Sequence, residues 1–220
     1  MSQVVKPGLS REKILQAAIA YADIHGLESL SMRKLADELG VKAMSLYNHI
    51  KNKDDLMGAL VEQVIIEIPL PDSRQDWKGE MRKRGKKSHE VLMAHPWACM
   101  PLVSRINDGP NMLNYVNASL GCLMEAGFDP ATADYAWNAM DNYIYGFTLQ
   151  SLSFPFQASE YQQVAQAYLP DFPKEQWPYL CALTEQVANG QHSGIHQFEF
   201  GFEMILNGLE ALLNKASDTD

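Results

Sequence analysis

The chain has 220 residues and a formal net charge of -9. Its length and its 46% of hydrophobic residues suffice for one or two globular domains with a substantial core. No run approaches the roughly 18 apolar residues of a membrane helix, and the N-terminal sequence lacks an apolar secretory leader, so we expect a cytoplasmic protein without membrane contacts. Three widely spaced cysteines without a CxxC pair argue against a disulfide framework or a zinc knuckle, and buried thiols are the simpler interpretation.

The first predicted helix begins after Ser10, whose hydroxyl can accept a hydrogen bond from a free backbone N–H group, and ends at Gly26. Its apolar side chains recur at helical spacing and form one stripe, which consists of Ile14, Ala17, Ala18, Tyr21 and Ala22. The pattern predicts an amphipathic helix that packs against the segment following it.

Residues 31–53 predict a helix, a tight glycine turn and a second short helix. Ser31 is placed to cap the first helix, and Gly40 can adopt the left-handed conformation that such a sharp turn needs. Leu46 and Ile50 turn one face of the second helix toward the core. The side chains left to point outward or sideways are Lys42, Ala43, Met44, Ser45, Tyr47, Asn48 and His49. This arrangement is typical of a helix-turn-helix that reads DNA.

A longer helix is predicted from Asp54 onward, with apolar residues every fourth position up to Ile68, and Pro69 and Pro71 end it. Further helices are expected near 73–94, 97–105, 110–126, 130–153, 159–168, 174–189 and 194–214, and no alternating strand pattern is evident. The fold class is therefore all-α. We divide the chain into a DNA-binding domain (1–53), a connecting helix with its linker (54–71) and a C-terminal domain (72–220).

The stretch from Ile14 to Leu60 resembles the tetracycline-repressor (TetR) family of transcriptional regulators, above all in GLESLSMRKLADELGV and LYNHIKNKDDL. The tail FEFGFEMILNGLEALL (198–213) resembles the closing helix of the branch that includes the tetracycline repressor. This resemblance implies an all-helical homodimer with an N-terminal three-helix DNA-binding domain. It also implies a C-terminal domain that dimerises and encloses a small-molecule inducer.

The candidate base contacts lie at the start of the second short helix and on the helix before it. Only outward side chains at the start of such a helix reach base edges in the major groove. Lys42 could donate to guanine, whereas Ala43 and Met44 could pack on a thymine methyl group. The fork of Arg33 matches guanine, and the resemblance implies that an arginine at this position contacts bases.

The resemblance also implies contacts with the phosphate backbone, through Ser45, Tyr47, His49 and Lys53. Tyr47 has an alternative role as a half-buried prop of its helix, and the role of Asn48 stays open. Residues 1–68 carry 8 Lys/Arg against 9 Asp/Glu, whereas residues 69–220 carry 10 against 18, so the acidic excess belongs mainly to the second part. A near-neutral first part can still present a cationic face to DNA.

The last helix is a candidate dimer interface, together with the helix near 130–153. Its predicted interface residues are Phe198, Gly201, Phe202, Ile205, Gly208, Leu209 and Leu212. Packing within the protomer is the alternative for this stripe. We favour an oligomer because Phe200 and Met204 lie off the stripe and make the helix apolar around more of its circumference than one-sided burial requires.

The middle of the chain combines aromatic, methionine and small polar residues, as expected for a ligand pocket. The predicted pocket residues are His95, Met100, Trp137, Met140, Asp141 and Ile144, and ordinary core packing is the alternative for each. An unpaired Asp141 in such a pocket would favour a cationic ligand. Tetracycline is not favoured, because no histidine occurs in residues 101–107, where the resemblance would require one to hold the metal-chelated drug.

Two further patterns could be mistaken for functional sites: a histidine pair near residue 194 and a basic run at 82–87. His192 and His196 have a metal-compatible spacing but no third ligand nearby, so we predict no metal site and no cofactor. The basic run 82–87 is interpreted as a solvated helix face.

The sequence thus predicts a ligand-responsive regulator, commonly a repressor in the resembled family, that binds a palindromic DNA operator as a homodimer and is released by an inducer. A helical enzyme is the first alternative, but no phosphate loop, GxSxG or HExxH motif supports it. A DNA-binding protein with a collapsed core, acting through protein partners alone, is the second.

Overall fold

The computed structural model describes residues 8–156, 159–194 and 197–217, and within these ranges the secondary structure is helical without β-strands. The helices are α1 (Arg11–His25), α2 (Met32–Leu39), α3 (Ala43–Leu46), α4 (Lys53–Ile65), α5 (Trp77–Ala94), α6 (Cys99–Ser104), α7 (Pro110–Glu125), α8 (Pro130–Ser153), α9 (Tyr161–Tyr168), α10 (Pro178–Ala188) and α11 (Phe198–Ser217). Short 3₁₀ turns lie at Leu27–Ser29, Pro96–Ala98 and Leu169–Asp171. The predicted all-α fold is confirmed.

Local capping groups define the first helices. The Ser10 hydroxyl accepts a hydrogen bond from the Lys13 backbone N–H at 3.3 Å, and the Ser31 hydroxyl does the same for Lys34 at 3.2 Å. Gly40 ends α2 in the left-handed region, with φ 64° and ψ 33°. These are the caps and the turn that the sequence predicts, because each depends only on residues within one helical turn.

The connecting helix α4 is shorter than predicted from the apolar spacing, which continues to Ile68. It ends at Ile65, and the chain continues through backbone turns in which the N–H of Ile68 bonds to the carbonyl of Ile65 at 3.1 Å. Ile68 is nevertheless buried, as the spacing predicts. The helix ends before Pro69 because a residue preceding proline disfavours the α conformation.

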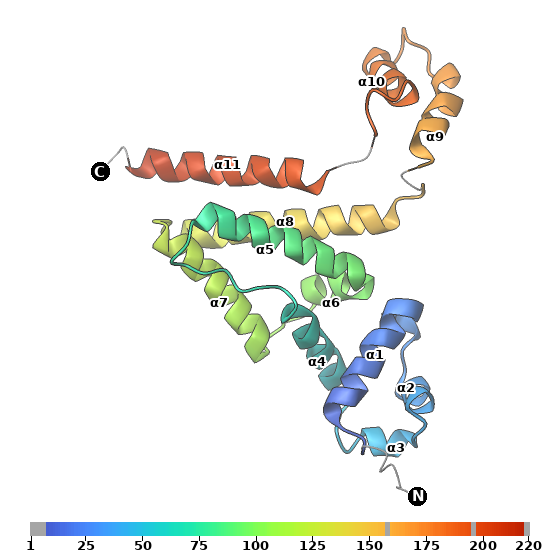
Figure 1. The fold of residues 1–220 in the computed structure, drawn as a ribbon, viewed down its shortest axis with the longest axis vertical. Helices are drawn as coiled ribbons and strands as arrows, with labels where there is room; N and C mark the ends of the chain where they lie inside the picture. The colour runs from blue at the N-terminus through green and yellow to red at the C-terminus, as the bar shows by residue number, and fades with distance from the viewer. Residues whose placement is uncertain (1–7, 157–158, 195–196, 218–220) are drawn as a thin grey trace, which may run out of the picture.

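Helices α1–α3, the predicted DNA-binding part, lie at one end of the molecule, and α4 leads from them to the C-terminal helices (Figure 1). There, α5 packs against α8 and α11, while α7 packs against α8 and α4. The α9 and α10 hairpin stands away from this body (Figure 1). Of the described helices, none has the length and apolar character to cross a membrane.

Candidate DNA-binding surface and ligand domain

The short helix α3 is anchored by its apolar side and presents its other side to solvent. Leu46 and Ile50 are fully buried against the first helices. Met44 is 75% exposed, and Tyr47 is 46% exposed, so Tyr47 is half-buried and both of its predicted roles stay open. Among the other predicted DNA contacts, Arg33, Lys42 and Lys53 are exposed, whereas Ala43, Ser45 and His49 are partly buried. The structure therefore leaves the predicted contact residues accessible near the turn.

An ion pair that the sequence analysis missed holds the end of α3 in place. Arg11 of α1 donates to the backbone carbonyl of His49 at 2.7 Å and pairs with Asp55 of α4 at 2.8 Å. Asp55 also accepts the backbone N–H of Lys51 at 2.7 Å. The hydrogen bond from Arg11 keeps the pKa of the Asp55 carboxyl below its ordinary value. This cluster ties the segment after α3 to both flanking helices, so it fixes the orientation of the DNA-reading surface.

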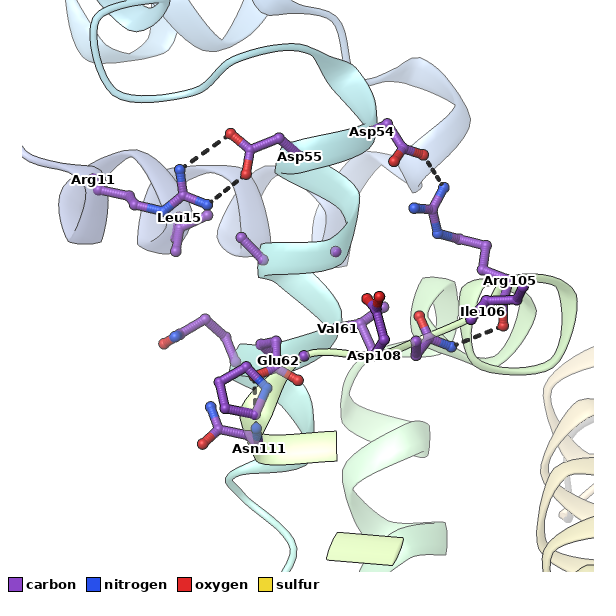
Figure 2. A pocket seen from close by; sticks show the side chains of 16 residues that line it. Arg11, Leu15, Asp54, Asp55, Val61, Glu62, Arg105, Ile106, Asp108 and Asn111 are labelled. Carbon is purple, nitrogen blue, oxygen red and sulfur yellow. Dashed lines mark hydrogen bonds and ion pairs between the residues drawn. The ribbon is translucent and has the colours of Figure 1, made fainter. Parts of the chain in front are cut away.

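A second set of contacts joins α4 to the C-terminal domain around a pocket of about 530 Å³. Figure 2 shows Arg105 reaching Asp54, a 2.6 Å ion pair, and Glu62 of α4 at the start of α7. The Glu62 carboxylate accepts the backbone N–H groups of Asn111 at 2.8 Å and Met112 at 3.0 Å. A carboxylate is stabilising at a helix N-terminus, so Glu62 couples the two helices physically.

Two predicted pocket residues lie elsewhere. His95 follows the last residue of α5, and its Nδ1 lies 2.8 Å from Asp23 of α1 while its Nε2 lies 3.3 Å from Glu67. Trp97 donates its indole N–H to the same Asp23 oxygen at 2.7 Å. The pocket assignment of His95 is therefore wrong, because the turn after α5 directs it toward the DNA-binding helices. Met100 is largely exposed on α6, and its assignment to a ligand pocket stays a prediction.

The other predicted pocket residues lie in or beside the core of the C-terminal domain. Met140, Asp141 and Ile144 of α8 are buried, and Trp137 is partly buried one turn earlier. Asp141 is not unpaired, because it forms an ion pair with Arg84 of α5. The condition under which Asp141 would favour a cationic ligand is therefore not met.

Arg84 also corrects the interpretation of the basic run 82–87 as a solvated face. Its side chain is 0% exposed, and its guanidinium lies 4.8 Å from the centre of the Tyr115 ring of α7. The Tyr145 hydroxyl donates to Asp141 at 3.3 Å, and burial raises the pKa of Tyr115 to about 12, so that ring stays neutral. The stripe Met81, Arg84, Ser88 and Val91 has helical spacing and is the pattern that could have indicated an inward Arg84.

Replacing Arg84 with Met is expected to lower the free energy of unfolding by about 3–5 kcal/mol, because it leaves the Asp141 charge buried without a partner. Urea denaturation at fixed protein concentration measures this change. The double variant Arg84→Met with Asp141→Leu is the control, since it removes both charges, and it should recover most of the loss. A single variant as stable as the wild type would contradict the importance of the pair.

The stripe predicted as a dimer interface mostly packs within its own protomer. Phe198, Phe202 and Leu209 are buried, the Phe202 ring lies against Gly85 of α5, and Gly201 faces the Tyr143 hydroxyl. The interface assignment of these four residues is therefore corrected, because α5 and α8 already cover them. Ile205 is partly buried in the same core.

The opposite side of α11 is uncovered. Phe200, Met204 and Leu212 are 72%, 63% and 54% exposed, and open space surrounds Gly208 between them. These four residues recur every fourth position and form one face, here called the outer face of α11. Of the predicted interface set, Gly208 and Leu212 belong to this face, which they share with Phe200 and Met204.

The histidine pair noted in the sequence lies only partly within the described residues. His192 is exposed, whereas His196 lies outside the described residues, and no cluster of three potential ligands occurs in the described part of the chain. Cys99, Cys122 and Cys181 are free and buried, as predicted.

Comparisons with known proteins agree with this architecture. Residues 14–60 match the family model described as bacterial regulatory proteins, tetR family, and residues 70–213 match the tetracyclin repressor-like C-terminal domain. The chain belongs to the TetR family. It is therefore a helix-turn-helix transcriptional regulator, and its family helix-turn-helix region contains every candidate DNA contact named above.

Among relatives in sequence, an HTH-type transcriptional regulator of Saccharopolyspora erythraea is 37% identical over 142 residues, which span 64% of this chain and 60% of that one. The HTH-type transcriptional repressor DrrR1 of Streptomyces coeruleorubidus is 27% identical, covering 94% of this chain and 80% of its own. The structure of ActR from Streptomyces coelicolor in complex with actinorhodin superposes with a TM-score of 0.82 at 25% identity, covering 96% of this chain and 99% of that one.

Proposed function

We propose that this TetR-family regulator is a repressor that binds a near-palindromic operator as a homodimer and dissociates when a small-molecule inducer binds its C-terminal domain. The observation that carries the proposal is the pairing of an anchored, solvent-facing α3 with the free outer face of α11 in a chain of this family. The relative DrrR1 is described as a repressor, and ActR is described in complex with actinorhodin. A role as an enzyme has no comparable support.

The DNA contacts divide into two kinds. Arg33, Lys42, Ala43 and Met44 read base edges in the major groove, and Ser45, Tyr47, His49 and Lys53 hold phosphates and set the register. The charged members of both sets, Arg33, Lys42 and Lys53, are exposed and therefore accessible to DNA. A helix of this length reads only a few base pairs, so two copies related by a twofold axis are needed for a useful site.

Dimerisation uses the outer face of α11 together with α8. The exposed side of α8 carries Ala139 and Gly146, small residues that allow a partner helix to approach closely. Four helices, two from each protomer, would bury Phe200, Met204 and Leu212. Burial of exposed apolar area is the main driving force for such an interface.

The inducer acts on the position of α4. The C-terminal helices hold α4 through Glu62 and Arg105 and hold α1 through His95, so a rearrangement around α7 would move the DNA-binding helices. Coupling of about 1–3 kcal/mol, typical of allostery, changes operator affinity roughly 5–150-fold. That range is sufficient for derepression.

Selection of genomic fragments by the purified protein tests the function. We expect enriched fragments to share a near-palindrome, and a complex with that sequence to contain two protomers. Fragments without shared sequence, or a complex with one protomer, would refute the proposal. The functions of genes beside the enriched sites suggest candidate inducers, which are then tested for their ability to release the protein from the operator.

Replacing Arg33 with Ala is expected to weaken binding to the selected operator by about 1–3 kcal/mol while affecting random DNA little, because a base contact is lost. Fluorescence anisotropy with both DNAs at one salt concentration measures the difference. Lys53→Ala serves as the matched control, since loss of a phosphate contact weakens both DNAs equally. Equal losses for Arg33→Ala would assign Arg33 to the backbone.

A further inference from the structure

Arg84 is a buried cation with unused hydrogen-bond donors. Its side chain is 0% exposed, and its Nη2 group pairs with Asp141. Its Nε and Nη1 atoms have no hydrogen-bond partner. A guanidinium carries five N–H donors, so most of them stay unused within the protein. Buried polar groups are nearly always hydrogen-bonded in native structures, so three unused donors on one buried side chain require an explanation.

A second unused donor lies on the next helix. The indole Nε1 of Trp137 is also buried without a partner, one turn of α8 before Asp141. The neighbouring hydroxyl groups are occupied, because Ser88 donates to the Arg84 carbonyl at 2.8 Å and Tyr145 donates to Asp141. Among the described residues, the unpaired buried side-chain atoms are all nitrogen donors. Three of these four nitrogen atoms belong to Arg84 and Trp137, so this part of the C-terminal domain offers unused donors.

We propose that the region around Arg84 and Trp137 binds an apolar, ring-bearing molecule through acceptor oxygens, such as those of a carboxylate, a phenolate or a quinone. The proposal rests on the proposed function, because this molecule would be the inducer. A cationic ligand is disfavoured, since it would have to compete with Arg84 for Asp141, the carboxylate that this guanidinium already occupies.

The surrounding side chains fit the apolar part of such a molecule. Tyr115 and Tyr145 provide ring surfaces, and Met140 and Ile144 provide aliphatic ones. The guanidinium stays charged beside Asp141, and a charge-assisted hydrogen bond in a water-poor interior is stronger than one between neutral groups. An anionic oxygen would thus gain more here than a neutral one.

Three probes with the same ring system separate these possibilities: 9-anthracenecarboxylate, 9-anthracenemethanol and 9-anthracenemethylammonium. Calorimetric titration of the full-length protein measures their affinities, and quenching of tryptophan fluorescence reports proximity to indole rings. We expect the carboxylate to bind at least about ten-fold more tightly than the ammonium probe, with the alcohol between them. Failure of the carboxylate to bind, or equal or tighter binding of the ammonium probe, would overturn the proposal.

Two variants test whether Arg84 causes the preference. Asp141→Asn removes the internal competitor for Arg84, so it should lower the thermal stability and yet tighten carboxylate binding, whereas general damage would weaken all three probes. Arg84→Met with Asp141→Leu should abolish the preference. Arg82→Gln is the matched control on the same helix, because Arg82 pairs with Glu203 at the surface and should leave the preference unchanged.

The same preparations are assayed for operator binding, which tests the proposed function separately from the proposed ligand class. A protein that selects its operator but shows no carboxylate preference, or keeps the preference in the double variant, refutes the ligand class alone. A protein that selects no operator refutes the proposed function.

Discussion

Raising the salt concentration from 50 to 200 mM is expected to weaken operator binding by about 10³–10⁵-fold, if the dimer contacts about 6–10 phosphates. Exposed cations surround α3 in each protomer, among them Lys34, Lys42, Lys51 and Lys53. Each phosphate that they neutralise releases counterions from the DNA, so the logarithm of the affinity falls linearly with the logarithm of the salt concentration. The overall charge of -9 does not prevent this, because the local field near α3 determines the attraction.

Fluorescence anisotropy with the selected operator over a salt series provides the slope. The control is Lys53→Gln, which should make the slope shallower by about one unit for each lost phosphate contact. A salt response that is flat in the wild type would contradict binding through the phosphate backbone.

Charging the outer face of α11 is expected to separate the dimer and to lower operator affinity by about 10²–10⁴-fold, the gain that bivalent binding usually provides. Phe200→Glu with Met204→Glu places two carboxylates where the apolar face is 72% and 63% exposed in the protomer. These carboxylates would have to be buried unpaired in a dimer, which is costly. The protomer should still fold, because neither side chain belongs to its core.

Sedimentation velocity measures the oligomeric state, and anisotropy measures operator binding. Leu113→Glu is the matched control, since Leu113 is also apolar and exposed but lies on α7. A doubly charged variant that remains dimeric would show that the protomers associate elsewhere.

The DNA-binding half was readily predictable from the sequence. Ser10, Ser31 and Gly40 act through hydrogen bonds and backbone angles within one helical turn, so their effect is written in neighbouring residues. The predicted helix over 130–153 agrees with α8 for the same reason, because Asp129 caps it and Pro130 suits its first turn. The helix-turn-helix required no knowledge of distant contacts.

The packing of α11 was less predictable, because this helix is apolar on two sides. Spacing alone cannot rank two apolar faces, and most of the residues predicted as an interface pack inside the protomer. Phe202 lies inside since Gly85 leaves room for its ring, and Phe200 and Met204 then point outward. A glycine on another helix thus decided which residues remain free for a partner.

The amino-acid sequence alone established the all-α class, the helix-turn-helix with its glycine turn, and the family. Helix propensity, capping and apolar spacing act over a few neighbouring residues, so they are visible in the sequence. The partners of the buried and bridging charges required the folded chain. Arg84 and Asp141 are 57 residues apart, and His95 and Asp23 are 72 apart. Whether such a charge meets solvent, a ligand or an opposite charge depends on how distant helices pack, because side-chain electrostatics is set by neighbours in space.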